Sequence, residues 1–250
     1  MHWRDRGILL SSRNHGETSA ILEVFTPAHG RHAGILRGGM SRRYKAVLQP
    51  GNELIVEWRA RLQEHIGVYR IEPARSRPAV LMSDRMALAA LSSLCSVLSV
   101  SLPERDPNPE CYERTIRLLD ALEASSNWLS DYLIWELDLL GEIGFGLDLE
   151  RCVVTGSTGN LVFVSPKSGC AVSLVGAGKW ADRMLPLPPC LLDRGTGDVG
   201  EVSDGLRTVG HFLRLGIIRG GKSASLPQAR VRFAESIKQL AEKTRSGASC

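Results

Sequence analysis

One glycine-rich segment has the spacing of a phosphate-binding loop. Gly216-Ile-Ile-Arg-Gly-Gly-Lys-Ser223 fits the pattern in which backbone N–H groups and a lysine, here Lys222, hold nucleotide phosphates. Such a loop needs a buried strand before it and a helix directly after it. The apolar residues from Val209 to Leu215 instead recur at helical spacing, and Pro227 soon follows. A nucleotide hydrolase built on Gly216 to Ser223 is therefore an alternative whose context is unfavourable.

Two cysteines, Cys152 and Cys170, stand where a metal site could lie, but the second cysteine of each pair is missing. Structural zinc is usually held by paired cysteines in Cys-x-x-Cys spacing, but Thr155 and Ser173 stand three residues after these cysteines. We therefore expect no zinc and no other cofactor. The density and spacing of a secreted disulfide scaffold are also missing, so reduced thiols are expected throughout. The six cysteines are Cys95, Cys111, Cys152, Cys170, Cys190 and Cys250.

Basic residues cluster in the first third of the chain, most densely in the glycine-rich stretch from Arg37 to Lys45. Arginine and lysine neutralise phosphates, and an aromatic ring such as Tyr44 can stack on an unpaired base. A single-stranded nucleic acid is the polyanion that this combination fits, while a solvated charged loop is the alternative. The candidate residues for binding this nucleic acid are Arg13, Arg31, Arg37, Arg42, Arg43, Tyr44, Lys45, Arg59 and Arg61.

The charge distribution along the 250 residues is uneven. Residues 1–75 hold 12 Lys/Arg against 7 Asp/Glu, residues 102–150 hold 3 against 12, and residues 205–245 hold 9 against 2. Two basic regions thus flank an acidic one, which favours a polyanion as partner for the ends. The first residues are charged rather than apolar, and no apolar run reaches about 18 residues. We expect a cytoplasmic protein without a membrane segment.

Short apolar runs separated by turn residues predict a small all-β module up to about residue 73. Leu54, Val56 and Trp58 alternate with polar or exposed positions, as in a half-buried strand. Five strands in about 70 residues have the size of an OB-fold barrel, although a small SH3-like barrel fits the same pattern. The predicted strands are Gly7 to Ser12, Ser19 to Thr26, Ala33 to Arg37, Glu53 to Trp58 and Ile66 to Ile71.

Helical periodicity begins after Pro78, with Ser83 as the expected N-cap of the first helix. The fold class is therefore α+β, with an OB-fold barrel over residues 1–78 followed by a helical domain over 79–250. Residues 150–200 are rich in Gly, Ser and Pro, which predicts an irregular insert. The later helices are expected at Glu110 to Leu122, Trp128 to Ile143, Asp204 to Leu215 and Pro227 to Lys243.

This order of parts resembles the RecO family, and several local sequences agree with it. Gly7-Ile-Leu-Leu with His15-Gly-Glu-Thr-Ser19 looks like the opening strand and turn of that family. Leu36-Arg-Gly-Gly-Met-Ser-Arg-Arg43 resembles its glycine- and arginine-rich loop, and Leu48-Gln-Pro50 leads into the fourth strand. Leu139-Leu-Gly-Glu-Ile-Gly-Phe-Gly-Leu147 is similar to the end of its central helix. The resemblance covers nearly the whole chain.

The resemblance implies a recombination mediator that catalyses no chemistry. Such a protein binds single- and double-stranded DNA, anneals strands, docks on the acidic tail of single-strand-binding protein and works with RecR to load RecA. The resemblance also implies that the insert is zinc-finger-like, and some members carry four zinc cysteines there, a set from which this sequence departs. An OB-fold RNA-binding protein is a further alternative, because phosphate contacts and stacking serve either polymer. The candidate residues for the protein tail are Arg114, Arg117, Arg207 and Arg214.

Overall fold

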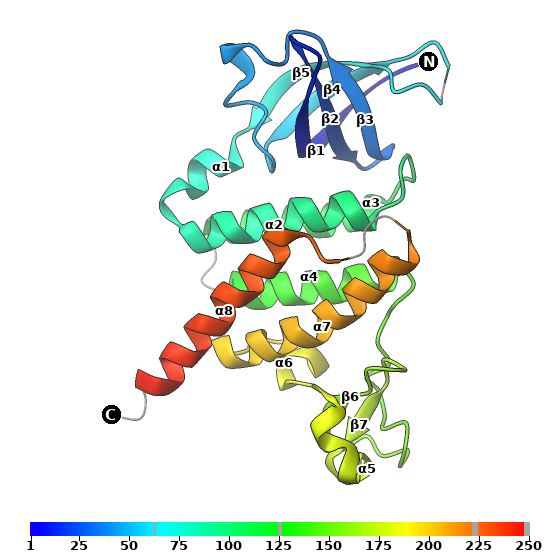
Figure 1. The fold of residues 1–250 in the computed structure, drawn as a ribbon, viewed down its shortest axis with the longest axis vertical. Coiled ribbons are helices and arrows are strands. Elements are labelled where there is room, and N and C mark those ends of the chain that lie inside the picture. The colour runs from blue at the N-terminus through cyan, green and yellow to red at the C-terminus, as the bar shows by residue number, and fades with distance from the viewer. Residues whose placement is uncertain (63, 125–126, 222–224, 248–250) are drawn as a thin grey trace. The chain divides into compact units, whose positions relative to one another are not determined.

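The computed structural model describes residues 1–62, 64–124, 127–221 and 225–247. The chain forms two compact units, Met1–Glu123 and Ala124–Cys250. The first unit contains five long strands and the helices that follow them, and the second contains helices and a small sheet (Figure 1). This is an α+β protein, as the sequence predicts.

The five strands of the first unit close into a barrel in the order β1-β2-β3-β5-β4. All neighbouring pairs are antiparallel except β3 and β5, which pair in parallel at Ile35 and Val68. Alternate side chains fill the interior, among them Leu54, Val56 and Trp58 of β4. The strands are β1 (His2–His15), β2 (Ser19–Thr26), β3 (Gly30–Leu36), β4 (Glu53–Arg59) and β5 (Val68–Arg75).

The strand bounds correct the sequence prediction where pairing with a distant strand sets them. The prediction for β2 is confirmed residue for residue. The first strand begins at His2 rather than Gly7, because its first half pairs with β4 from His2 opposite Arg59 onward. The fifth strand starts two residues later than expected and continues to Arg75, opposite Glu53 of β4. A strand end therefore depends on whether its partner still offers hydrogen bonds.

Two helices, α2 (Arg85–Ser101) and α3 (Pro109–Ala124), follow the barrel in the chain, and α2 packs against β1. The N-cap of α2 is Asp84 and not Ser83, because the Asp84 carboxylate accepts hydrogen bonds from the N–H groups of Met86 and Ala87. Ser83 instead ends the short 3₁₀ helix η2 (Leu81–Ser83), which follows α1 (Arg77–Val80). On the α3 side, the ring of Tyr112 lies edge-on to Phe25 of the barrel.

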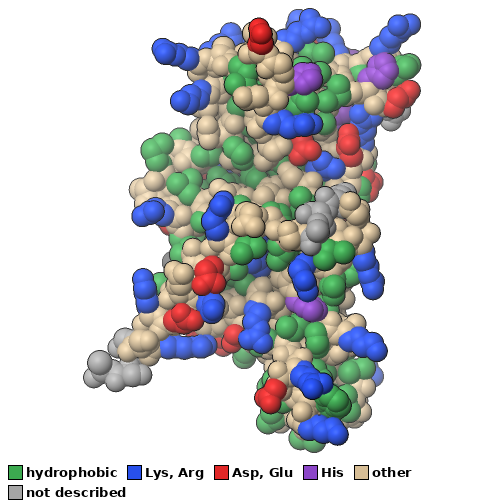
Figure 2. Space-filling view, in the orientation of Figure 1, with side chains coloured by type: hydrophobic (Ala, Val, Ile, Leu, Met, Phe, Trp, Pro, Cys, Tyr) green, Lys and Arg blue, Asp and Glu red, His purple; other side chains and the backbone are tan. Residues whose placement is uncertain are grey.

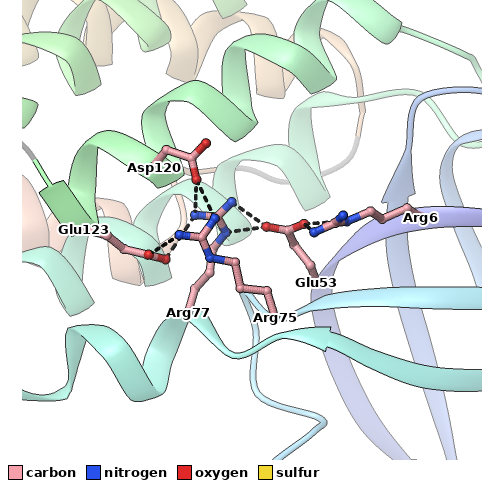
Figure 3. A network of polar contacts seen from close by, with 6 residues as sticks. All are labelled: Arg6, Glu53, Arg75, Arg77, Asp120 and Glu123. Carbon is pink, nitrogen blue, oxygen red and sulfur yellow. Dashed lines mark hydrogen bonds and ion pairs between the residues drawn. The ribbon is translucent and has the colours of Figure 1, made fainter.

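A network of charged side chains joins the barrel to α3 (Figure 3). Arg77 is 1 % exposed and donates to Glu53 of β4 (Nε to Oε1, 2.7 Å) and to Asp120 of α3 (2.8 Å). Arg6 binds the other oxygen of Glu53, and Arg75 binds Asp120. The network fixes the β4–β5 side of the barrel relative to the helix.

The second unit is built on α4 (Trp128–Glu142), α7 (Val199–Arg219) and α8 (Gln228–Gly247). A buried ion pair links α4 to α8, because Arg230 donates to both oxygens of Glu136 and also to the carbonyl of Leu206. The Tyr132 hydroxyl donates to the same carboxylate. Every hydrogen-bonding atom of the Glu136 carboxylate is thus engaged, which a fully buried charge requires.

The segment 150–200 is more ordered than the sequence predicts. It holds a three-stranded sheet in the order β7-β6-β8, with short helices after β7 and after β8. Strands of two to four residues carry no readable alternation, so only their pairing reveals them. The elements are β6 (Leu161–Val164), β7 (Ala171–Ser173), α5 (Leu174–Ala177), η3 (Gly178–Arg183), β8 (Leu185–Pro186) and α6 (Pro189–Leu192).

Candidate nucleic-acid interface

A groove of about 680 Å³ runs across the outside of the barrel. Its lining includes the apolar residues Leu36, Ile55 and Ile71. Five arginines from separate segments line it against two glutamates, an excess of three positive charges. We call this feature the arginine groove. Its charged and aromatic residues are Arg4, Arg37, Arg43, Tyr44, Glu57, Arg59, Tyr69, Arg70 and Glu72.

Strand register builds one wall of the groove. Arg4 of β1 lies directly opposite Glu57 of β4, and Glu57 lies opposite Arg70 of β5. Residues opposite one another in a sheet have Cβ atoms about 5 Å apart, so the three side chains form one row across the strands. Because inward positions of β4 are apolar, this row occupies the outer face of the barrel.

A glycine turn brings the other wall into place. Gly38 has a φ of +68°, and a Cβ on Gly39 would lie 2.8 Å from the Cβ of Ala20. Only glycine fits this left-handed turn and close approach without strain. The chain then forms the 3₁₀ helix η1 (Arg42–Tyr44), whose Tyr44 packs against the barrel core. The turn therefore carries Arg43 back over the barrel surface.

The arginines of the groove differ in whether their guanidinium groups already have partners among the described residues. The Arg43 guanidinium lies 4.8 Å from the centre of the Tyr44 ring and donates to its hydroxyl at 2.9 Å. Arg37 and Arg70 form no ion pair or side-chain hydrogen bond with any residue that the structure describes. Their charges are thus available to an anion in the groove.

Two exposed ion pairs occupy the remaining arginines. Arg4 contacts Glu72 at 3.2 Å, and Arg59 contacts Glu57, which also binds His2. The hydrogen bond from Arg59, together with that from His2, holds the pKa of the Glu57 carboxyl below its usual range. Exposed pairs of this kind are weak and can exchange a carboxylate for a phosphate.

Four of the predicted DNA-binding residues meet in this groove, namely Arg37, Arg43, Tyr44 and Arg59. Two groove arginines, Arg4 and Arg70, were not predicted. Arg42 and Lys45 are exposed on either side of Arg43 and Tyr44, and Arg13 is exposed near the end of β1. Arg31 is taken up by an ion pair with Glu23 (2.8 Å) and a hydrogen bond to the Leu102 carbonyl (3.1 Å). Arg61 lines a neighbouring recess.

The predicted partner-binding arginines lie in both units. Arg114 and Arg117 are on α3 in the first unit, and Arg114 lies 3.7 Å from Glu110 of the same helix. Arg207 and Arg214 are exposed on α7 in the second unit, seven residues apart and thus near one face. A docking role for either pair stays a prediction.

The phosphate-loop alternative lacks its structural context. Residues 216–219 form the last turn of α7, so a helix stands where a phosphate loop requires a strand. Lys222 and Ser223 lie outside the described residues. The apolar run before the motif is therefore the buried face of a helix, as its spacing indicates.

In the insert, Thr155, Ser173 and Gly176 surround the Cys152 sulfur in the way that the ligands of a structural zinc site surround the metal, but only one of the four residues is a cysteine. The Cys152 sulfur accepts hydrogen bonds from the Ser173 hydroxyl (3.3 Å) and the Thr155 N–H (3.4 Å). A Cβ built on Gly176 would lie 2.8 Å from the same sulfur. Two pairs of positions with Cys-x-x-Cys spacing, 152/155 and 173/176, therefore meet at this sulfur. One thiol, two hydroxyls and a glycine do not fit zinc, which needs four ligands such as thiolate or imidazole.

Cys170 does not belong to this cluster, because its thiol donates to the carbonyl of Ser168 (3.8 Å). Burial would raise the pKa of the Cys152 thiol, but the hydrogen bonds from Ser173 and Thr155 outweigh it and lower the pKa to about 6. The five cysteines that the structure describes are free thiols.

Comparison with known proteins identifies the chain. Residues 1–77 match the family model "Recombination protein O N terminal", and residues 82–223 match "Recombination protein O C terminal". The chain is 51 % identical over 237 residues to the DNA repair protein RecO of Roseobacter denitrificans, covering 95 % of this chain and 98 % of that protein. It is 53 % identical over 235 residues to the protein of the same name from Cereibacter sphaeroides, covering 94 % and 98 %.

A barrel with a cationic groove, followed by helices, is here part of a DNA repair and recombination protein. The chain belongs to the RecO family. None of the helices in the described ranges is long and apolar enough to cross a bilayer.

Proposed function

We propose that the barrel is an OB-fold that binds single-stranded DNA in the arginine groove, and that the chain is a recombination mediator without catalytic chemistry. The observation that carries this proposal is the convergence of five arginines and Tyr44 on one groove. A basic groove with an aromatic ring is the usual means of holding an unpaired strand, since every base has a face that can stack. On the side shown in Figure 2, Lys and Arg side chains project from the barrel.

The test is a salt-dependent binding titration with a single-stranded oligodeoxynucleotide. In Arg37→Ala/Arg43→Ala, the slope of log affinity against log salt should fall by roughly one to two units, at somewhat under one per lost phosphate contact. Arg85→Ala is the matched control, because Arg85 is an exposed cation of the same unit outside the groove. An unchanged slope in the double variant would remove the groove from the proposal.

The same titration separates DNA from RNA and single strands from duplex. A strand held by phosphates and stacking alone would bind as DNA or as RNA, whereas a contact to the 2′-hydroxyl distinguishes them. We infer that both single- and double-stranded DNA bind and that complementary strands are annealed, as the family implies. Equal or tighter binding of a matched RNA would favour the RNA-binding alternative.

We further infer the protein partners that the family implies, namely RecR, RecA and the acidic tail of single-strand-binding protein. Arg114 and Arg117 would bind the tail carboxylates, with Arg207 and Arg214 as further candidates. Calorimetric titration of a tail peptide should show about 1 to 3 kcal/mol weaker binding to Arg114→Ala/Arg117→Ala, since contacts to carboxylates are charge-assisted. Equal affinities would assign the tail to another surface.

A further inference from the structure

An apolar recess of about 790 Å³ opens beside the arginine groove at the end of the barrel. Ile35, Ile66 and Val68 supply apolar walls, and Arg59 and Arg61 supply positive charge. The recess and the groove share two lining residues, Arg59 and Val68. A ligand that follows the groove can therefore enter the recess without leaving the barrel surface.

Hydrogen bonds from fixed parts of the first unit hold the segments that line the recess. They run from Trp58 Nε1 to the Ile66 carbonyl (3.0 Å), from the Ile35 N–H to the Gly67 carbonyl (3.0 Å), from Arg105 to the His65 carbonyl (2.9 Å) and from the Met1 ammonium to the Ala60 carbonyl (2.7 Å). Gly67 has a φ of +66°, and a Cβ there would lie 2.4 Å from the Trp58 ring. The recess is thus preformed, which reduces the entropy that a ligand must overcome on binding.

The chemistry of the two connected spaces matches the two parts of a nucleotide. Phosphates suit the arginine groove, and an apolar ring suits the recess next to it. In a duplex the bases are paired and stacked, so that an apolar ring is presented only by a strand whose bases are free or flipped out. Arg59 lines both spaces, so its guanidinium can contact the phosphate of a nucleotide whose base lies in the recess.

We propose that this recess is a base-binding subsite, which receives an unpaired base of the strand whose phosphates lie in the arginine groove. This inference rests on the proposed function, because it assumes that the groove binds DNA. It goes further in predicting a preference for single strands that comes from Ile35, Ile66 and Val68 rather than from the arginines. The recess would accept any base, since apolar contact and stacking do not read hydrogen-bonding edges.

The test compares Ile66→Ala with Leu62→Ala, using an intact single-stranded oligodeoxynucleotide and an abasic strand of the same length. Leu62 is the matched control, because it is exposed at 47 % just before the same wall and does not line the recess. Ile66→Ala should bind the intact strand roughly fivefold more weakly, which corresponds to the loss of little more than one buried methylene group. Its affinity for the abasic strand and its salt slope should equal those of the wild type.

Each other outcome has a defined meaning, provided that thermal melting shows both variants to be folded. An equal loss on intact and abasic strands would overturn the base-binding subsite, because the effect would not depend on bases. Unchanged binding by Ile66→Ala would also overturn it. The recess would then be better explained as a site for an apolar side chain of a protein partner. In both cases a reduced salt slope in Arg37→Ala/Arg43→Ala would still support the proposed function. A wild-type protein that binds neither strand would refute the proposed function itself.

Discussion

Arg77 is the charge whose removal should most damage the first unit, and replacement by methionine isolates that effect. Methionine keeps an unbranched side chain of moderate length but carries no charge. In the wild type the Arg77 guanidinium is buried and contacts Glu53, Asp120 and Glu123 (Figure 3). These carboxylates come from β4 and α3, so Arg77→Met removes the central cation between the barrel and the helix.

The magnitude follows from how much positive charge remains. Removing one partner of a buried ion pair costs about 3 to 5 kcal/mol, because the other charge stays buried without compensation. Glu53 is 2 % exposed but keeps Arg6 at 2.8 Å, and Glu123 keeps Arg75. Arg77→Met should therefore lie near the lower end, at about 3 kcal/mol.

Urea unfolding followed by circular dichroism measures this loss, with Arg75→Met as the matched control. Arg75 binds two of the same carboxylates from a much more exposed position, so its removal should cost under about 1 kcal/mol. The double variant Arg77→Met/Glu53→Gln also removes the Glu53 charge that Arg77→Met leaves buried with less compensation. Its loss in free energy of unfolding should therefore be smaller than the sum of the losses in the two single variants. Equal losses in Arg77→Met and Arg75→Met would refute the argument from burial.

Two further predictions concern the insert. Thr155→Cys/Ser173→Cys/Gly176→Cys should convert the Cys152 cluster into a four-thiol site that retains about one zinc per chain, where metal analysis of the wild type should find well under one. Failure of this variant to bind zinc would show that segments 152–155 and 173–176 do not bring their four side chains to a single metal position. The Cys152 thiol should ionise near pH 6, and ultraviolet absorbance of the thiolate should detect this in the wild type but not in Cys152→Ala. The pKa of this thiol in the folded protein lies below its value of about 8.5 in the unfolded chain. Its contribution to the free energy of unfolding is therefore complete above the unfolded pKa and is lost as the pH falls through about 6. If the free energy of unfolding depended on pH in the same way in the wild type and in Cys152→Ala, this prediction would be contradicted.

The barrel strands could be predicted because their local pattern is strong. In β4, Leu54, Val56 and Trp58 alternate with outward side chains, and turn residues separate the runs. The ends of β1 and β5 could not be predicted, since they depend on hydrogen bonds to β4. The small sheet of the insert was missed for a related reason. Its strands are joined by few pairs, such as Phe163 with Val172, and are too short to show a period.

The glycine-rich half of the candidate site could also be predicted, because its signal is local. Arg37, Arg43 and Tyr44 are close together in sequence, and the intervening glycines favour a turn that keeps them close in space. By contrast, the partly buried Arg31 shows why a charge cluster alone does not define a site. Its ion pair with Glu23 joins neighbouring strands, a contact that composition does not reveal.

Arg4 and Arg70 have no local signal, because a lone arginine on a strand is usually a solvated surface residue. Their place in the groove results from register: β4 pairs with β1 on one side and with β5 on the other, and Glu57 is the residue opposite both. A shift of one residue in either pairing would turn one of these arginines to the opposite face of the barrel. The apolar residues next to these arginines prevent that shift, because it would also move Tyr69 of β5 out of the core, or Trp3 of β1 away from it. The same alternation that buries the core of the barrel therefore holds the arginines of its outer groove in line.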